Sequence, residues 1–262
     1  MSIKLVAVDM DGTLLSSANE VPEDFIPWVR SHPDIRTVIA SGRQYFTLEH
    51  DFREAVDSLI FIAENGALVF EHGEMIYRDV MEEQDIIKCL DIIAGIPHAH
   101  PILCGAESAY LVESADGGKN GALLYYKRHA FVKNMEALKE MVHRDSIVKI
   151  AIYFDIDAAE KSSEVFSGIG KHLSAVVSGS NWLDISNASV DKGNAIRQIQ
   201  ERYGITAEES MAFGDYLNDL GMMHVCSESY CMKNGHPEVM KAARHTAESN
   251  DDDGVMKVLR TL

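Results

Sequence analysis

The chain has 262 residues, of which 46% are hydrophobic and 25% are charged, and its 41 acidic and 24 basic side chains give a formal net charge of −17 at pH 7. These fractions are those of an ordinary folded protein, which argues against disordered, collagen-like and other fibrous chains. A protein this acidic lacks the basic surface that coating nucleic acid or an anionic membrane requires, so we expect small ligands or protein partners instead.

The sequence predicts a cytoplasmic protein. The apolar stretch at residues 3–8 runs straight into two aspartates, so it lacks the length and cleavage site of a secretory signal. No apolar run approaches the roughly 18 residues of a membrane span. The four cysteines are too sparse for a disulfide scaffold and form no C-x-x-C pair, so we expect reduced, mostly buried thiols.

The first part of the chain alternates between short apolar runs and helical stretches. Strands are predicted at residues 3–8, 37–40 and 59–63, and helices at residues 23–29 and 44–55. Such alternation indicates right-handed crossovers and a parallel sheet. Each predicted strand ends in polar residues, at the sheet edge where ligands of such folds gather.

In the middle of the chain this alternation of strands and helices, the first rhythm of the chain, stops. A hairpin is predicted at residues 67–77, around His72-Gly73, and a helix at residues 86–94. His98 and His100 are predicted to be solvated loop residues, because Pro97 and Pro101 flank them. The remaining predicted elements are strands at residues 109–112, 123–126, 147–154 and 173–177, and helices at residues 133–143 and 158–172. This section is predicted to be a separate α+β unit.

The first rhythm is predicted to return from Trp182 onward. The expected elements are a helix at residues 196–203, a capping box at residues 206–209, strands at residues 211–213 and 230–232, and a helix from Pro237 toward residue 245. We therefore expect an α/β protein. Its Rossmann-like parallel-sheet core would comprise residues 1–80 and 185–262, and an inserted α+β domain would span residues 81–184.

Two aspartates follow the first predicted strand directly. Asp9 and Asp11 are separated by one residue, and Gly12 after them permits a tight turn. In an extended chain their carboxylates point the same way, so their repulsion is costly unless a cation or a shared proton is present. Mg²⁺ accepts carboxylate and carbonyl oxygens and would relieve the repulsion. Taken alone, the pair fits a simple turn or helix cap equally well.

More carboxylates follow the strand predicted at residues 211–213. Asp215 and Asp219 come directly after it. If this strand lies beside the first one, four aspartates meet at one sheet edge, and they need a counter-charge. This favours a metal site over ordinary acidic turns.

Candidate phosphate ligands lie elsewhere in the chain. Ser41-Gly42-Arg43 ends the second strand and offers a hydroxyl, backbone N–H groups and a cation, which together suit a phosphate or sulfate. Lys192 opens the helix after Asp191, although a lone lysine is more typical of a solvated side chain than of a catalytic one.

The order of these residues resembles the four motifs of the haloacid dehalogenase superfamily. Residues 65–67, 232–234 and 250–255 further resemble its Cof-like branch, whose type IIB cap lies between the second and third motifs. Lys233 and Gly235 depart from the pattern expected there, without touching the chemistry. The four motifs are Asp9-Met10-Asp11-Gly12-Thr13-Leu14-Leu15, Ser41-Gly42-Arg43, Asp191-Lys192-Gly193 and Gly214-Asp215-Tyr216-Leu217-Asn218-Asp219.

This resemblance implies a role for each motif. Asp9 would be the nucleophile that forms a phosphoaspartyl intermediate, and Asp11 the general acid and then the base. Mg²⁺ would be held by the Asp9 carboxylate, the Asp11 main-chain carbonyl and Asp215. The implied phosphate ligands are Ser41, Gly42, Lys192 and Asn218, and the implied supporting residues are Thr13, Arg43 and Asp219.

Four residues of the middle section are candidates for substrate selection. Lys127 and Arg128 belong to an aromatic and basic cluster, although an edge strand with a solvated basic end explains them as well. Trp182 and Asp184 lie where the chain returns to the core, and Trp182 is equally typical of a packed hinge.

The resulting hypothesis is a magnesium-dependent phosphatase acting on small phosphorylated metabolites, above all sugar phosphates, with no nucleic-acid or membrane partner. One alternative is a phosphomutase of the phosphomannomutase type, which would isomerise a hexose phosphate instead of releasing phosphate. The other is a non-catalytic metabolite sensor on the same fold, which the presence of both Asp9 and Asp11 disfavours.

Overall fold

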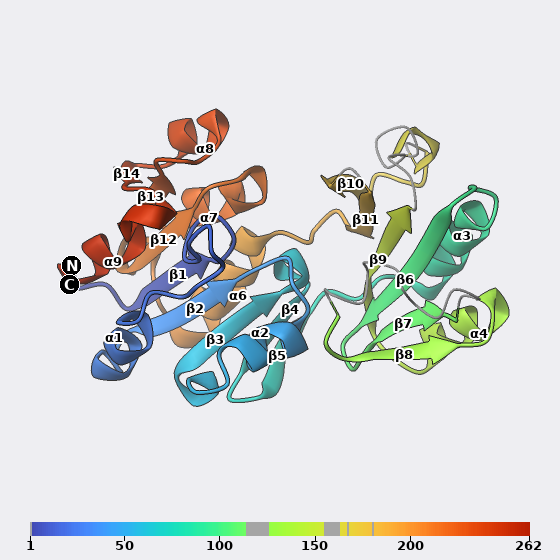
Figure 1. The fold of residues 1–262 in the computed structure, drawn as a ribbon, viewed down its shortest axis with the longest axis horizontal. Coiled ribbons are helices and arrows are strands. Elements are labelled where there is room, and N and C mark those ends of the chain that lie inside the picture. The colour runs from blue at the N-terminus through green and yellow to red at the C-terminus, as the bar shows by residue number, and fades with distance from the viewer. Residues whose placement is uncertain (1, 114–125, 155–162, 167, 180) are drawn as a thin grey trace. The chain divides into compact units, whose positions relative to one another are not determined.

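The chain is divided into two compact units. The structure is a computed structural model that describes residues 2–113, 126–154, 163–166, 168–179 and 181–262. One unit comprises Met1–Tyr77 and Asp191–Leu262, and the other, here called the inserted unit, comprises Arg78–Val190 (Figure 1). The border expected at residue 184 falls inside β11 (Trp182–Asn187), which pairs with two strands of the inserted unit and therefore lies wholly within that unit.

The core unit is built on one sheet. Among the described residues, eight strands form it in the order β14-β13-β12-β1-β2-β3-β4-β5. Its strands are β1 (Leu5–Asp9), β2 (Arg36–Ala40), β3 (Leu59–Ala63), β4 (Leu68–Glu71), β5 (Glu74–Arg78), β12 (Ser210–Gly214), β13 (Glu228–Met232) and β14 (His245–Ala247). The pairs from β14 to β3 are parallel, and β4 runs antiparallel to β3.

The strand order reverses between β1 and β12. From β1 the chain proceeds through β2 to β3 on one side, and from β12 through β13 to β14 on the other. Such a switch point is where ligands of open α/β sheets bind, beyond the carboxyl ends of the strands. The loops after β1 and β12 are therefore placed to form a site.

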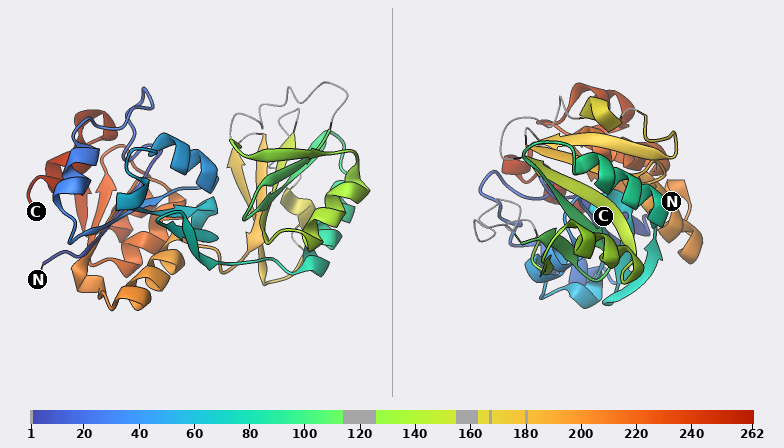
Figure 2. Two further views of the ribbon diagram at one scale, coloured as in Figure 1. Left: turned by 90° about the horizontal axis from the view of Figure 1, so that it is seen from below. Right: turned by 90° about the vertical axis from the view of Figure 1, so that its right-hand side faces the viewer.

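Helices cover both faces of this sheet, as the views in Figure 2 show. The fully buried residues of β1 and β3 match this environment, since a strand covered on both faces is apolar throughout. One face packs against α6 (Lys192–Tyr203), α7 (Leu220–Val225) and α8 (Pro237–Ala242). The other face meets α1 (Phe25–Ser31) and α2 (Tyr45–Asp51), through ring contacts among Phe25, Tyr45, Phe52 and Phe61.

Most predicted elements of the core are confirmed, with differences at their ends. The helix predicted to run to residue 55 ends at Asp51, because Phe52 leaves the helical conformation and packs its ring against Phe61. The capping box of Thr206 and Glu209 is present, but it caps one 3₁₀ turn, since β12 begins at the next residue. The helix from Pro237 ends at Ala242, before the unpredicted edge strand β14. The last helix is α9 (Gly254–Leu259).

The inserted unit has its own sheet and core. Among the described residues, six strands form the order β10-β11-β9-β6-β7-β8. Besides β11, they are β6 (Ala99–Gly105), β7 (Ala109–Val112), β8 (His129–Val132), β9 (Ile147–Phe154) and β10 (Leu173–Gly179). Helices α3 (Glu83–Ile93) and α4 (Met135–Lys139) pack against one face of this sheet.

Three predictions for the inserted unit differ from the structure, and a fourth lies mostly outside the described residues. His100 and Pro101 lie in β6 and not in a loop, because β6 pairs with β9 from Ala99 onward and tolerates proline at its start. Of the helix predicted at residues 158–172, the described residues from Glu164 onward are not α-helical, because Glu164–Phe166 form a 3₁₀ turn that precedes two glycines. The strand predicted at residues 123–126 lies outside the described residues except for Tyr126, which is not in a strand. The core pattern, expected to return from Trp182 onward, does not return there, because Trp182 begins β11 of the inserted unit.

The described helices are short or amphipathic. None of them combines the length and the apolar character that crossing a bilayer requires.

Candidate active site

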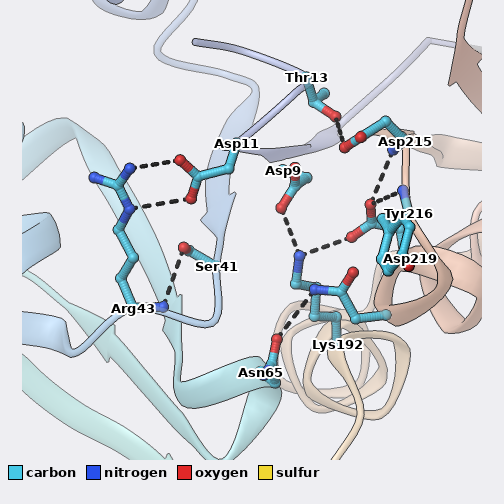
Figure 3. Close-up of polar contacts among 11 residues, drawn as sticks. Asp9, Asp11, Thr13, Ser41, Arg43, Asn65, Lys192, Asp215, Tyr216 and Asp219 are labelled. Carbon is cyan, nitrogen blue, oxygen red and sulfur yellow. Dashed lines mark hydrogen bonds and ion pairs between the residues drawn. The ribbon is translucent and has the colours of Figure 1, made fainter. Parts of the chain in front are cut away.

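Four segments of the core unit meet at the carboxyl ends of β1, β2 and β12. Figure 3 shows that Asp9, Ser41, Asp215 and the first residue of α6, Lys192, converge from these segments. These four residues therefore lie together, although 206 positions separate Asp9 from Asp215 in the sequence.

Lys192 lies at the centre of the cluster. Its side chain is fully buried, and its Nζ donates to Oδ1 of Asp9 at 2.6 Å and to Oδ1 of Asp219 at 2.7 Å. The interpretation of Lys192 as a solvated lysine is therefore wrong. Burial alone would lower the pKa of Lys192, but the two carboxylates raise it above its ordinary value, so the ammonium stays charged.

The position of Lys192 follows from the start of α6. Asp191 is the N-cap, and its side chain accepts a hydrogen bond from the backbone N–H of Asn194 at 3.1 Å. Because Lys192 is the first helical residue, its long side chain extends from the helix end to Asp9, at the end of β1.

Asp219 uses both carboxylate oxygens. While Oδ1 accepts from Lys192, Oδ2 accepts from the backbone N–H groups of Asp215 at 2.9 Å and Tyr216 at 3.1 Å. The buried carboxylate thus holds the loop after β12 in shape.

Asp215 is held against the first motif. Thr13 donates through Oγ1 to Oδ1 of Asp215 at 3.0 Å. Gly12 has φ of +83°, and a Cβ there would lie 2.5 Å from Oδ2 of Asp215. Both the backbone conformation and the space therefore require glycine.

The three carboxylates of this cluster carry more negative charge than the one lysine beside them can balance. Asp9, Asp215 and Asp219 each offer a carboxylate oxygen, and these oxygens lie within 4.8 Å of one another. Burial and the nearby Asp219 carboxylate raise the pKa of Asp9 well above its usual range, with Lys192 opposing them, and the same two causes raise the pKa of Asp215. Three hard oxygen donors and one lysine leave negative charge that suits a divalent cation.

The carboxylate of Asp11 lies outside this cluster. It accepts hydrogen bonds from Nε of Arg43 at 3.1 Å and from Nη2, while Nη1 of Arg43 donates to Asp51 at 3.2 Å. The Asp11 side chain is 57% exposed, and Figure 3 shows it directed at Arg43. Only the main chain of Asp11 is expected to bind the metal, so this arrangement does not conflict with the expected ligand set.

Asn65, for which no role was predicted, contacts both Ser41 and Asn218. Ser41 is buried, its Oγ accepts from the backbone N–H of Arg43 at 3.2 Å, and its carbonyl accepts from the N–H of Asn65. Asn218 donates through Nδ2 to Oδ1 of Asn65 at 3.1 Å. The position of Asn65, directly beyond the end of β3, was the signal that could have marked it.

The four candidates for substrate selection lie in the inserted unit. Asp184 pairs with Lys149 at 3.5 Å, and both side chains are largely buried. Trp182 packs against Tyr153, with 5.1 Å between ring centroids. Lys127 and Arg128 are exposed residues that precede β8. The pairing of Asp184 with Lys149 was not predicted, although a lysine within the apolar run of β9 was a signal for a buried ion pair.

Comparisons with known proteins identify relatives over the whole chain. A sequence model of the haloacid dehalogenase-like hydrolases matches residues 6–259. The 5-amino-6-(5-phospho-D-ribitylamino)uracil phosphatase YbjI of Escherichia coli is 31% identical, covering 99% of this chain and 96% of that protein. The crystal structure of SMU.1108c from Streptococcus mutans has a TM-score of 0.84 at 26% identity, covering 99% of this chain and 98% of its own. The subclass IIB sugar phosphatase BT4131 shares the fold, with a TM-score of 0.77 at 21% identity over 98% of both chains.

Proposed function

Because this chain belongs to the haloacid dehalogenase-like hydrolase family, we propose that it is a magnesium-dependent phosphatase of small phosphorylated metabolites, with sugar and sugar-alcohol phosphates the preferred class. The observation that carries the proposal is the buried contact of Lys192 with Asp9 and Asp219, beside Asp215. A buried cation that orients one carboxylate among several is suited to attack on an anionic phosphate.

The first step is attack by Asp9. One oxygen of its carboxylate is bound by Lys192, and the other forms the new bond to phosphorus while the bond from phosphorus to the substrate oxygen breaks. The products are a phosphoaspartate and an alcohol, whose oxygen takes its proton from Asp11. For this the Asp11 carboxyl has to leave Arg43 and carry a proton when substrate binds.

The second step is hydrolysis of the phosphoaspartate. The Asp11 carboxylate, which lost its proton in the first step, accepts a proton from water as the water oxygen bonds to phosphorus. The bond to Asp9 breaks, which regenerates its carboxylate and releases inorganic phosphate. One residue serves both steps because they are sequential.

The remaining residues of the motifs bind the phosphoryl group and the metal. Ser41, Gly42, Lys192 and Asn218 would donate to the phosphoryl oxygens, where negative charge is spread in the transition state. Mg²⁺ would be held by the carboxylates of Asp9 and Asp215 and the carbonyl of Asp11. When bound, it would supply positive charge that lets an anionic nucleophile approach an anionic phosphate.

We assign the role of a type IIB cap to the inserted unit, and substrate selection to Trp182, Asp184, Lys127 and Arg128. The name of the relative YbjI specifies a substrate with a phosphorylated ribityl chain, which supports phosphates of sugars and sugar alcohols as the class for this chain.

The proposal is tested by phosphate release from a panel of phosphorylated metabolites, with and without Mg²⁺. We expect activity on p-nitrophenyl phosphate and on sugar or sugar-alcohol phosphates, and reversible loss of activity in excess chelator. Asp9→Asn removes the nucleophile with little change in shape, so it should abolish turnover and leave the melting temperature intact. Wild-type rates in this variant would reject the role of Asp9. Conversion of a hexose phosphate to its isomer without phosphate release would favour the mutase.

A further inference from the structure

The turn after β3 has an unusual backbone. Glu64, Asn65 and Gly66 have φ of +49°, +58° and +108°, so three successive residues are left-handed. Residues other than glycine adopt this region rarely and at a cost, and asparagine tolerates it best among polar residues. Such strain persists only where the surrounding structure fixes it, and it is frequent at functional sites.

The first contact of this turn is with the phosphate-binding segment after β2. The N–H of Asn65 donates to the carbonyl of Ser41 at 3.0 Å, and the N–H of Glu64 donates to the carbonyl of Arg43 at 3.1 Å. These two bonds bracket Gly42. The Asn65 side chain lies against it, since a Cβ on Gly42 would be 3.0 Å from Oδ1 and 3.1 Å from Nδ2 of Asn65.

The turn also contacts the two segments that carry Lys192 and Asn218. A Cβ on Gly66 would lie 2.4 Å from the carbonyl oxygen of Asp191 and 3.0 Å from the backbone nitrogen of Lys192. Oδ1 of Asn65, a residue labelled in Figure 3, accepts a hydrogen bond at 3.1 Å, and its donor is Nδ2 of Asn218. Asn65 therefore joins the loop after β2 through its backbone N–H to the loop after β12 through its side chain, beside the start of α6.

We propose that Asn65 is a positioning residue for the phosphoryl group, acting by fixing the amide of Asn218. This inference rests on the proposed function. The acceptor Oδ1 takes one N–H of Asn218, which orients the second N–H of that amide for a phosphoryl oxygen. A donor that is fixed before substrate binds loses no orientational freedom during the reaction. It therefore stabilises the phosphoryl group more than a mobile amide does. The left-handed backbone is what brings the Asn65 amide to this position.

The test uses Asn65→Gly, which removes the amide and keeps a residue at ease in the left-handed region. Inhibition by orthovanadate is measured with p-nitrophenyl phosphate as substrate and Mg²⁺ present, together with the rise in Tm that vanadate produces. We expect the inhibition constant and KM to rise about tenfold, as for loss of a hydrogen bond to a charged group. Without vanadate, the Tm should stay unchanged or increase.

His72→Gly is the matched control. His72 also has a positive φ, +51°, and is exposed in the hairpin turn between β4 and β5. The register Ile60↔Glu71 places that turn beyond the beginning of β3, whereas Asn65 follows its end. His72→Gly also places glycine at a left-handed position, so it should change the Tm as Asn65→Gly does. It should leave the vanadate inhibition constant and KM unchanged.

Asn218→Ala and the double variant show whether Asn65 acts through Asn218. We expect Asn65→Gly to change vanadate inhibition less than twofold when Asn218 is already alanine, since the coupled pair is then gone. A further tenfold loss in the double variant overturns the inference, as does a wild-type inhibition constant in Asn65→Gly. A lowered Tm that accompanies the kinetic loss assigns Asn65 a structural role and also overturns it. A wild-type protein that hydrolyses no phosphomonoester and binds no vanadate overturns the proposed function together with this inference.

Discussion

Replacing Lys192 by methionine should strongly lower the free energy of unfolding of the core unit. Methionine has a similar length and no charge, so the substitution leaves the carboxylates of Asp9 and Asp219 buried without the ammonium that now contacts both at 2.6 and 2.7 Å. Breaking a buried ion pair from one side costs about 3–5 kcal/mol. Because whole domains have about 5–15 kcal/mol of stability, this loss would be a large part of the total.

Urea unfolding followed by tryptophan fluorescence measures this loss. The chain has two tryptophans, Trp28 in the core unit and Trp182 in the inserted unit, so a Trp182→Phe background reports the core alone. With an m-value of about 2 kcal/mol/M, the midpoint should fall by about 1.5–2.5 M. Lys233→Met is the control, because Lys233 pairs with Glu248 at the surface, 3.4 Å away, and such pairs contribute at most about 1 kcal/mol.

The pH dependence separates a charge effect from a packing effect. Lys192 lowers the pKa of Asp9, so its removal raises that pKa further above the unfolded value. An acid with a raised pKa in the folded state binds protons more readily there, so folding gains stability as the pH falls through that pKa. The deficit of Lys192→Met should therefore shrink from neutral toward acidic pH. A deficit below about 1 kcal/mol, or one independent of pH, would refute this account of the buried ion pair.

Two further predictions concern glycine and cysteine. Gly12→Ala should lower stability by about 1–3 kcal/mol and weaken Mg²⁺ binding, because the Cβ would lie 2.5 Å from Oδ2 of Asp215 at a backbone φ of +83°. Calorimetry measures the Mg²⁺ affinity, and an unchanged affinity would contradict this prediction. Burial raises the pKa of Cys226 to about 12 and of Cys89 and Cys231 to about 11, so their thiolates are scarce at pH 8. Ellman's reagent should label these thiols slowly in the folded protein and fully in urea, and rapid labelling of the folded protein would contradict this.

The sequence predicts best those site residues that directly follow a strand along the chain. Asp9 and Asp215 are predictable because each comes directly after an apolar run that can only be a buried strand. The burial of Lys192 was not predictable, because it depends on α6 packing beside β1, a contact between residues 183 positions apart. The ion pair of Asp11 with Arg43 was missed for the same reason. The extent of the inserted unit was misjudged where β11 leads back to the core, since a single strand does not reveal which sheet it joins.

The distance between Asp9 and Asp215 is set by the register of two buried strands. In the parallel pair of β1 and β12, Val8 lies opposite Phe213, so Asp9 and Asp215 emerge just beyond the same edge of the sheet. A slip of one residue would turn every side chain of β12 to the opposite face. Because all residues of both strands are buried, that slip would have to repack helices on both faces of the sheet. The apolar residues that form the core therefore also fix the spacing of the acidic residues, which explains how these like charges are held close together.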